Sequence, residues 1–170
     1  MEKIVEVVVP YAASQVSHGA EVIQIFDSWV GALSPGDYEK CVLPYTRILV
    51  RAIQSTGVPV VYFSTGGSSY VELLHEAGGE VLGLDWRIRL DDAWRRIRYE
   101  AAVQGNLDPV ALFAPLPKLR ARVEDVLRHA GDRPGFIFNL GHGILPETPV
   151  ENVKAVVAMV REFSATVAAD

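Results

Sequence analysis

Ser28 and His142 stand out among the reactive side chains because each follows a short apolar run of the sequence. Ser28 comes directly after 22-VIQIFD-27, and His142 follows 135-GFIFNL-140 within the stretch LGHG. A serine hydroxyl both donates and accepts hydrogen bonds, and an imidazole exchanges a proton near neutral pH. The glycines on either side of His142 remove neighbouring side chains and permit unusual backbone angles, so a ligand could approach it closely. These two residues are the first candidates for a functional site.

Further apolar runs also end in polar residues. The runs are 58-VPVVYFS-64, 80-EVLGLDW-86 and 102-AVQGNL-107, and the polar residues at or just after their ends are Ser64, Thr65, Asp85, Asn106 and Asp108. The carboxyl ends of parallel strands meet on one face of a sheet or barrel, where active sites collect. Together with Asp27, these residues predict a polar rim around the opening at that face of the sheet or barrel.

Each of these residues also has a structural explanation. Asp27 and Asp85 can cap a following helix or bond loop amides. Asn106 and Asp108 suit the turn at the end of their run. Ser28 can be a loop hydroxyl without a function. The residue types alone leave both readings open.

Several familiar motifs are absent. The loop 65-TGGSS-69 resembles a phosphate cradle, but it lacks both nucleotide-binding spacings and has no lysine nearby. No HxH, HExxH or CxxC spacing occurs, so we predict no metal site. Ser28 lies in DSWVG rather than in a GxSxG elbow, which argues against a serine hydrolase. The other histidines, His18, His75 and His129, lie near predicted helix ends and are expected to be structural.

The composition is typical of a soluble globular domain. Hydrophobic residues make up 49% and charged residues 22% of the 170 residues, and the formal net charge of −5 argues against nucleic-acid binding. The single cysteine, Cys41, excludes an internal disulfide, and its helical context predicts a thiol that faces the core. No apolar run reaches the roughly 18 to 20 residues that span a bilayer, and MEKIVEVVV is not a secretory signal. We therefore expect a cytoplasmic protein that does not bind membranes.

Apolar runs alternate with amphipathic segments from residue 20 onward. The runs are apolar at nearly every position, which is typical of parallel strands covered on both faces. Helical patterns separate them, at 35–56, 68–78, 90–98, 117–131 and 149–165. These βα units, without a hairpin signal, predict an α/β fold with a parallel sheet.

The first segment and the closure of the sheet are ambiguous from the residues alone. The run IVEVVV favours a strand by propensity, but Ile4, Val8, Ala12 and Val16 share a helical face, and we predict a helix with Pro10 as a kink site. Five units suit a doubly wound sheet. They also suit part of a closed (β/α)₈ barrel, which needs eight units and about 250 residues.

Three long stretches closely resemble uroporphyrinogen decarboxylases. They are 19-GAEVIQIFDSWVGALSPGDYEKCVLPY-45, 103-VQGNLDP-109 and 136-FIFNLGHGILPETPVENVKAVV-157, linked by YFSTGG, EAG and GLDWR. The resemblance covers essentially the whole chain. The family fold is a (β/α)₈ TIM barrel of about twice this length. The resemblance thus implies a single partial domain over residues 1–170, the carboxyl-terminal portion of the barrel with about five of its eight units.

The resemblance also implies a reaction and a site. Uroporphyrinogen decarboxylases are carboxy-lyases of porphyrin and heme biosynthesis. They convert uroporphyrinogen III to coproporphyrinogen III by removing the carboxyl groups of the acetate side chains, without a metal or an organic cofactor. Ser28 matches the family's substrate-contacting hydroxyl, and His142 matches the LGHG histidine that contacts a substrate carboxylate; both are expected to be catalytic. Phe26 matches an aromatic position that lines the substrate site. The implied partners are the tetrapyrrole substrate and a second copy, in a homodimer.

Part of the family's site has no counterpart in this sequence. An arginine motif, a pyrrole-binding aspartate and a substrate-contacting tyrosine all belong to the amino-terminal half of the family barrel. The substrate carries many carboxylates and this chain is itself net negative, so repulsion is expected without those arginines. Protonating a pyrrole carbon also needs a placed carboxylate, and the resemblance gives that role to neither Asp27 nor Asp85. We expect the chain on its own to be an inactive fragment.

Two alternatives stay open. A corrinoid-related methyltransferase of the same superfamily has a similar barrel but binds zinc through His-x-Cys and a further cysteine. Here the corresponding positions read Tyr-Phe-Ser and Gly-His-Gly. The second alternative is a non-catalytic half-barrel that needs a partner chain. A truncated gene or an incomplete sequence also explains the length.

Overall fold

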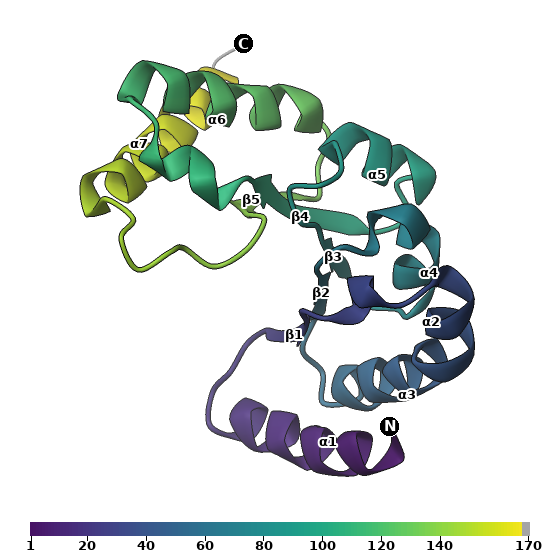
Figure 1. Cartoon of the computed structure of the whole chain (residues 1–170). Coiled ribbons are helices and arrows are strands. Elements are labelled where there is room, and N and C mark those ends of the chain that lie inside the picture. Colours follow the sequence, from purple (N-terminus) through teal and green to yellow (C-terminus); the bar gives the residue numbers. More distant parts are fainter. Residues whose placement is uncertain (168–170) are drawn as a thin grey trace.

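Five parallel strands form one sheet in the computed structural model, which describes residues 1–167. The strands pair in sequence order, and Figure 1 shows them in an arc: β1 (Ile23–Asp27), β2 (Val60–Ser64), β3 (Val81–Gly83), β4 (Ala102–Leu107) and β5 (Phe136–Leu140). The predicted strands and their parallel order are confirmed. Each strand is followed by helix, so the chain has the α/β architecture that the alternating pattern predicts.

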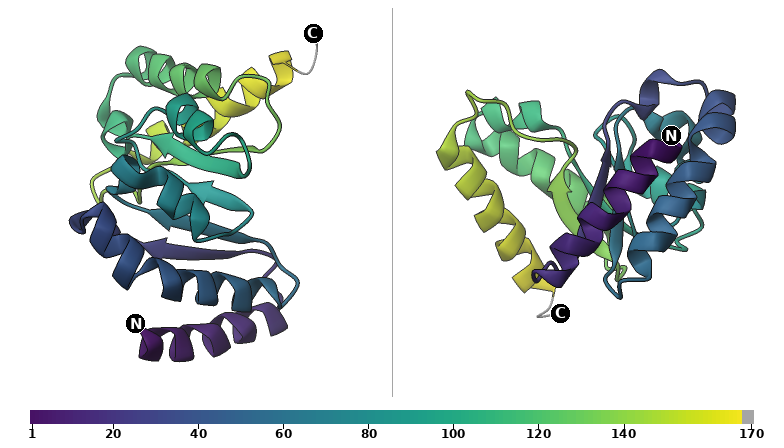
Figure 2. Two further views of the ribbon diagram at one scale, coloured as in Figure 1. Left: turned by 90° about the vertical axis from the view of Figure 1, so that its right-hand side faces the viewer. Right: turned by 90° about the horizontal axis from the view of Figure 1, so that it is seen from below.

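Helices cover the convex side of the arc, and the concave side is open (Figures 1 and 2). The helices are α1 (Glu2–Ser17), α2 (Pro35–Cys41), α3 (Leu43–Gln54), α4 (Val71–Glu76), α5 (Leu90–Arg96), α6 (Leu116–Ala130) and α7 (Val150–Val167). Short 3₁₀ turns follow three of the strands: η1 (Val30–Ala32), η2 (Gly67–Tyr70) and η3 (Pro109–Phe113). The curved single sheet is the geometry of a partial barrel rather than of a doubly wound sheet with helices on both faces.

Burial differs between the middle and the ends of the sheet. Every residue of β2 and β3 is buried, whereas β5 alternates between half-buried and exposed residues. On the concave face, Phe26 of β1 is 68% exposed and Ile137 of β5 is 44% exposed. The prediction that all strands are covered on both faces is therefore wrong for the two end strands. Each end strand pairs on one side only within the described residues.

Three apolar clusters lie between the sheet and its helices. One joins α1 and α3 to β1, a central one contains Tyr62, Leu82 and Trp94, and a third joins β5 to α6 and α7. Each cluster is formed by neighbouring units of the chain. The core is thus distributed along the convex side of the arc rather than concentrated at one centre.

Local chemistry explains where the helices differ from expectation. The predicted helix 35–56 is broken at Val42, because Pro44 lies in the first turn of α3 and cannot continue α2. The first segment forms a helix, α1 (Glu2–Ser17), as predicted, and it runs through Pro10. The prediction that the Cys41 thiol faces the core is wrong, since Cys41 is exposed at the end of α2.

Candidate functional site

A cavity of about 340 Å³ on the concave side contains all three predicted site residues. Phe26 and Ser28 come from β1 and the loop after it, and His142 comes from the loop after β5. The other lining residues are Gln24, Phe63, Asn139, Leu140 and Gly143. Residues more than 100 positions apart in sequence meet here because both loops leave the carboxyl ends of their strands. We call this cavity the His142 pocket.

The imidazole of His142 lies against two aromatic rings. The ring centroids of Phe63 and Trp86 are each 6.3 Å from that of His142, in edge-to-face arrangements. Such contacts hold a ring in place without using its nitrogens. His142 itself is exposed, so its nitrogens can meet a ligand in the pocket.

The two glycines beside His142 have different roles. A Cβ on Gly141 would lie 2.6 Å from the backbone nitrogen of Trp86, whereas a Cβ on Gly143 would meet nothing within 4 Å. Neither glycine has a positive φ. The expectation of unusual backbone angles is therefore wrong. Gly141 lets the loop after β5 pack against the loop after β3, and only Gly143 leaves open space beside the histidine.

Two glutamines on the concave face were missed by the sequence reasoning. The Nε2 of Gln104, on β4, donates to the Oε1 of Gln24, on β1, over 3.3 Å, and Gln104 is buried. Gln24 lines the His142 pocket. The signal was present in the sequence, because an amide inside an otherwise apolar strand needs a hydrogen-bonding partner.

Asp27 does not face the His142 pocket. The hydroxyl of Tyr62 donates to Oδ2 of Asp27 over 3.0 Å, and the hydroxyls of Tyr62 and Tyr38 lie 3.1 Å apart. This chain of three side chains lies on the helix-covered side of β1. Burial raises the pKa of Asp27 above its ordinary value, and the hydrogen bond from Tyr62 offsets part of that rise. Burial likewise raises the pKa of Tyr38 to about 12.

Asp85 is also occupied by the protein itself. Its buried carboxylate accepts hydrogen bonds from the backbone nitrogens of Gly66 (2.7 Å) and Arg87 (3.0 Å) and from the Arg87 guanidinium (2.6 Å). Asn106 donates to the carbonyl oxygens of Asp85 and Ile88, and Asp108 caps η3. The structural reading is correct for these residues. The predicted polar rim is thus only partly right, because its carboxylates hold loops together instead of facing the mouth.

Of the remaining histidines, only His18 contacts a helix-end carbonyl within the described residues, whereas the other two lie beside carboxylates. His18 Nδ1 lies 2.7 Å from the carbonyl oxygen of Ser14, and His75 and His129 lie beside Glu100 and Asp125. Within residues 1–167, no three His, Cys, Asp or Glu side chains are grouped so that they could hold a metal ion. No helix in the same range is both long and apolar enough to cross a membrane.

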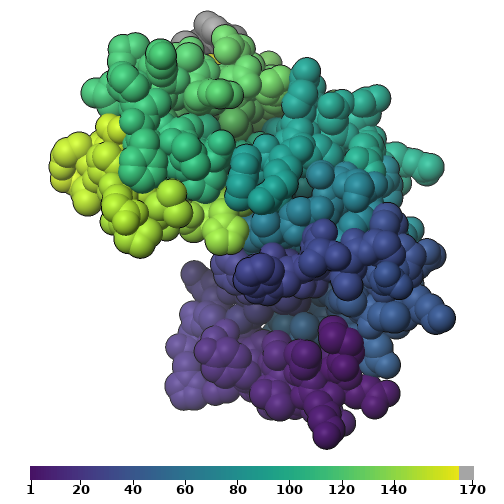
Figure 3. All heavy atoms as spheres, in the orientation of Figure 1, coloured from purple at the N-terminus to yellow at the C-terminus, as the bar shows by residue number. Residues whose placement is uncertain are grey.

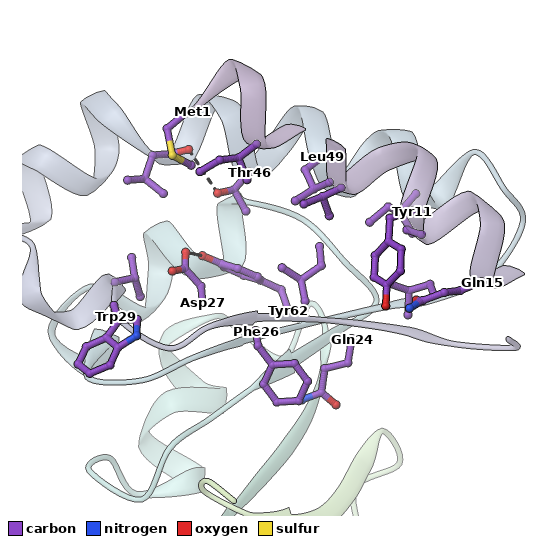
Figure 4. A pocket seen from close by; sticks show the side chains of 18 of the residues that line it. Met1, Tyr11, Gln15, Gln24, Phe26, Asp27, Trp29, Thr46, Leu49 and Tyr62 are labelled. Atoms are coloured by element: carbon purple, nitrogen blue, oxygen red, sulfur yellow. Dashed lines mark hydrogen bonds between the residues drawn. The ribbon is translucent and has the colours of Figure 1, made fainter. Parts of the chain in front are cut away.

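A larger cavity, of about 540 Å³, lies beside the unpaired edge of β1. It is bounded by α1, α3 and both faces of β1, and Figure 4 shows Tyr11, Asp27 and Trp29 around it. The space-filling view shows the corresponding opening between α1, in purple, and the blue residues of the next unit (Figure 3). The cavity therefore opens along a strand edge that has no pairing partner within residues 1–167.

Five parallel βα units with a pocket at the carboxyl ends of the strands define an α/β protein of the barrel class. The chain is similar to a solved methyltransferase from Methanosarcina mazei, with a TM-score of 0.84 and 25% identity, over 94% of this chain and 47% of that one. The sequence model of the uroporphyrinogen decarboxylase (URO-D) family matches residues 1–163. The chain therefore belongs to the uroporphyrinogen decarboxylase family.

Relatives from several bacteria carry the same name. The chain is 63% identical over 163 residues to the uroporphyrinogen decarboxylase of Solibacter usitatus, covering 96% of this chain and 47% of that protein. It is 53% identical over 162 residues to that of Carboxydothermus hydrogenoformans, covering 95% and 46%. The chain thus spans about half the length of the curated relatives it matches.

The two glycines beside His142 should respond differently to substitution. We expect Gly141→Ala to lower the free energy of unfolding by roughly 1–3 kcal/mol, since the added methyl group must displace the Trp86 backbone. Gly143→Ala, the matched control, should stay within about 0.5 kcal/mol of the unsubstituted chain. Urea unfolding followed by circular dichroism measures both. Equal losses in the two variants would contradict the assigned packing role.

Replacing Asp27 should make stability less dependent on pH. Because burial raises the pKa of Asp27 in the folded chain, ionising it costs folding free energy above the folded pKa. Asp27→Asn cannot ionise and keeps an oxygen that accepts from Tyr62. We expect its stability relative to the unsubstituted chain to be higher at pH 7 than near the ordinary pKa of 3.8.

Urea unfolding at a series of pH values tests the Asp27 expectation. Asp132→Asn, which removes one charge at an exposed position, controls for the change in net charge. A stability difference between Asp27→Asn and the unsubstituted chain that does not change with pH would rule out the assigned desolvation.

Proposed function

We propose that this chain forms the carboxyl-terminal portion, about five of eight βα units, of a uroporphyrinogen decarboxylase. The complete enzyme would convert uroporphyrinogen III to coproporphyrinogen III. In each step an acetate arm loses its carboxyl group as CO₂, and a proton takes its place on the remaining carbon. The observation that carries the proposal is the 63% identity to a protein of that name over 96% of the chain.

The His142 pocket is the proposed substrate site of this portion. His142 would bind a substrate carboxylate, Ser28 would donate a hydrogen bond, and Phe26 would lie against a pyrrole ring. All three line one cavity, which supports the proposal. Gln24 lines the same cavity, and its Oε1 is already bonded to Gln104, so its amide nitrogen is free to donate to a ligand. The proposed decarboxylation would need neither a metal nor an organic cofactor in the His142 pocket.

The charges around the pocket support the expectation that the chain alone is inactive. Among the lining residues there is no lysine, arginine, aspartate or glutamate, and His142 is the one ionisable side chain. A substrate with many carboxylates gains little electrostatic attraction from such a pocket. A placed carboxylate for the protonation step is likewise not among these residues. The cations and the acid would come from the rest of the barrel, which would add strands at the free edges of β1 and β5.

The proposal includes a cytoplasmic homodimer of the complete enzyme. Both features come from the resemblance of the sequence to the family. A half-barrel that associates with a separate chain carrying the remaining strands is compatible with the same free edges. Expressing the remaining strands either fused to this chain or as a separate chain would distinguish the two arrangements.

A methyltransferase function has less support. The similarity to the Methanosarcina mazei protein is extensive in fold, but the sequence identity is 25%, against 63% for the decarboxylase from Solibacter usitatus. The single cysteine of the chain, Cys41, is exposed on α2 and is not among the residues of the His142 pocket. Thiolate-bound zinc needs cysteines at the strand ends, where this chain has Ser64 and His142.

The isolated chain should not turn over uroporphyrinogen. We expect no coproporphyrinogen after incubation of the purified chain, because the His142 pocket lacks cations and an acid. Chromatography of the oxidised porphyrins measures the product. The positive control is a fusion of the amino-terminal part of the Solibacter usitatus relative, which this chain does not match, to the chain. Turnover by the chain alone at the rate of that fusion would refute the assignment of the missing groups.

His142→Ala in the active fusion should lower kcat/KM by roughly 10- to 100-fold, as expected for the loss of one hydrogen bond to a charged group. Because the side chain is exposed, the unfolding midpoint should not change. His18→Ala, at an exposed helix end, is the matched control and should keep full activity. Unchanged kinetics of His142→Ala would remove this residue from the substrate site.

A further inference from the structure

Two carboxamide side chains meet across the concave side of the sheet, beside the His142 pocket. The Nε2 of Gln104 donates to the Oε1 of Gln24 over 3.3 Å, although β4 and β1 are separated in the sheet by β2 and β3. Figure 4 shows Gln24 and Phe26 on one side of β1 and Asp27 on the other. Gln24 therefore belongs to the surface that lines the pocket, and Gln104 reaches it from β4.

The sheet leaves room for this contact at β3. Gly83 pairs in register with Phe63 of β2 and with Gln104 of β4, and side chains at paired positions of parallel strands point to the same face. A Cβ on Gly83 would lie 2.9 Å from the Cβ of Phe63. Because Gly83 has no side chain, β3 places nothing at this level between Gln104 and Gln24.

The bond to Gln104 decides which atom of Gln24 is left for a ligand. A carboxamide has an oxygen that accepts and a nitrogen that donates, and rotation about the last side-chain bond interchanges them. The oxygen of Gln24 is bonded to Gln104, and its Nε2 has no protein partner within residues 1–167. Gln104 is 8% exposed, so losing the bond would leave a buried polar group without its partner. That cost holds Gln24 in one orientation.

A second carboxamide of the pocket is arranged in the same way. The Oδ1 of Asn139 accepts from the backbone nitrogen of Leu140 over 2.8 Å, and Asn139 lines the pocket together with Gln24. Both side chains use their oxygens within the protein and keep their nitrogens for a ligand. Carboxamide nitrogens carry no charge and do not titrate near neutral pH, so these two donors are the same at every pH at which the chain is folded.

We propose that Gln104 is a positioning residue of the His142 pocket: it holds the carboxamide of Gln24 so that Nε2 donates to an oxygen of the bound substrate. The inference rests on the proposed function of the pocket. Gln104 is not among the residues that line the cavity, so it acts through Gln24. The opposite orientation of Gln24 directs its carbonyl oxygen at a substrate carboxylate, and two acceptors cannot form a hydrogen bond.

A double-mutant cycle in the active fusion tests whether Gln104 acts through Gln24. Methionine is similar in size to glutamine and lacks the carboxamide. We expect Gln24→Met to lower kcat/KM roughly tenfold and Gln104→Met to lower it by about three- to tenfold. The double variant should lose no more than Gln24→Met alone, because Gln104 then has nothing to position. Losses that multiply, or full activity of Gln104→Met, would overturn the proposal.

Val103→Ala is the control for a loss of stability in β4. Val103 precedes Gln104 in the strand and is buried in the central apolar cluster on the helix-covered side. The variant should unfold at a lower urea concentration and keep its kcat/KM per folded enzyme, with folding checked by circular dichroism. A fall in kcat/KM as large as that of Gln104→Met would trace the effect to stability and reject the positioning role.

Side-chain NMR relaxation of the full 170-residue chain tests the positioning without turnover. The amide group of Gln24 is assigned by its loss in Gln24→Met. We expect it to be rigid, with an order parameter of about 0.8, and to fall below about 0.6 in Gln104→Met. An unchanged order parameter would overturn the proposal even with an active fusion. If the fusion does not convert uroporphyrinogen, the proposed function fails, and the order parameter still decides whether Gln104 positions Gln24.

Discussion

The buried carboxylate of Asp85 is the interaction on which the arrangement of the strand ends depends. One negative charge, almost fully removed from water, accepts three hydrogen bonds from two loops. A buried charge is costly unless it is fully paired, so these loops have few alternative positions. The bond from Gly66 ties the loop after β2 to the loop after β3, and the two bonds from Arg87 hold the loop after β3 around Asp85, with the Arg87 guanidinium over the Trp86 ring. The loop after β5 then packs against that backbone through Gly141. The loop that carries His142 thus packs against the backbone that Asp85 holds, although the carboxylate itself does not face the pocket.

Much of the fold could be read from the sequence because its signals are local. Continuous apolar runs separated by amphipathic segments predict parallel strands and their helices, and all five strands are found. The break in the predicted helix 35–56 was also local, since Pro44 cannot continue α2. Exposure of the end strands was not predictable in the same way. It depends on which strands have neighbours, and a run such as FIFNL reads the same in the middle of a sheet and at its edge.

The candidate site was only half predictable. Ser28, Phe26 and His142 were chosen from the residues and the family resemblance, and they line one pocket. Asp27 was assigned to the rim although it lies between Phe26 and Ser28, whose side chains point to the opposite face. Side chains alternate along a strand, so the rule that groups Gln24, Phe26 and Ser28 also excludes Asp27. The role of Asp85 could not be found this way, because its partners come from different units and their approach is a tertiary feature.

The distribution of the core along the arc has a consequence for how the chain holds together. Each apolar cluster joins units that are adjacent in sequence, and within residues 1–167 the strands pair only with their sequence neighbours. Energetically the chain then resembles a linear repeat array, in which stability is a sum over neighbouring interfaces. Opening can begin at either end while the middle units stay folded, so the amide protons of β2 and β3 would exchange most slowly. Closing such an arc into a ring would remove both ends at once and convert graded fraying into a single cooperative transition.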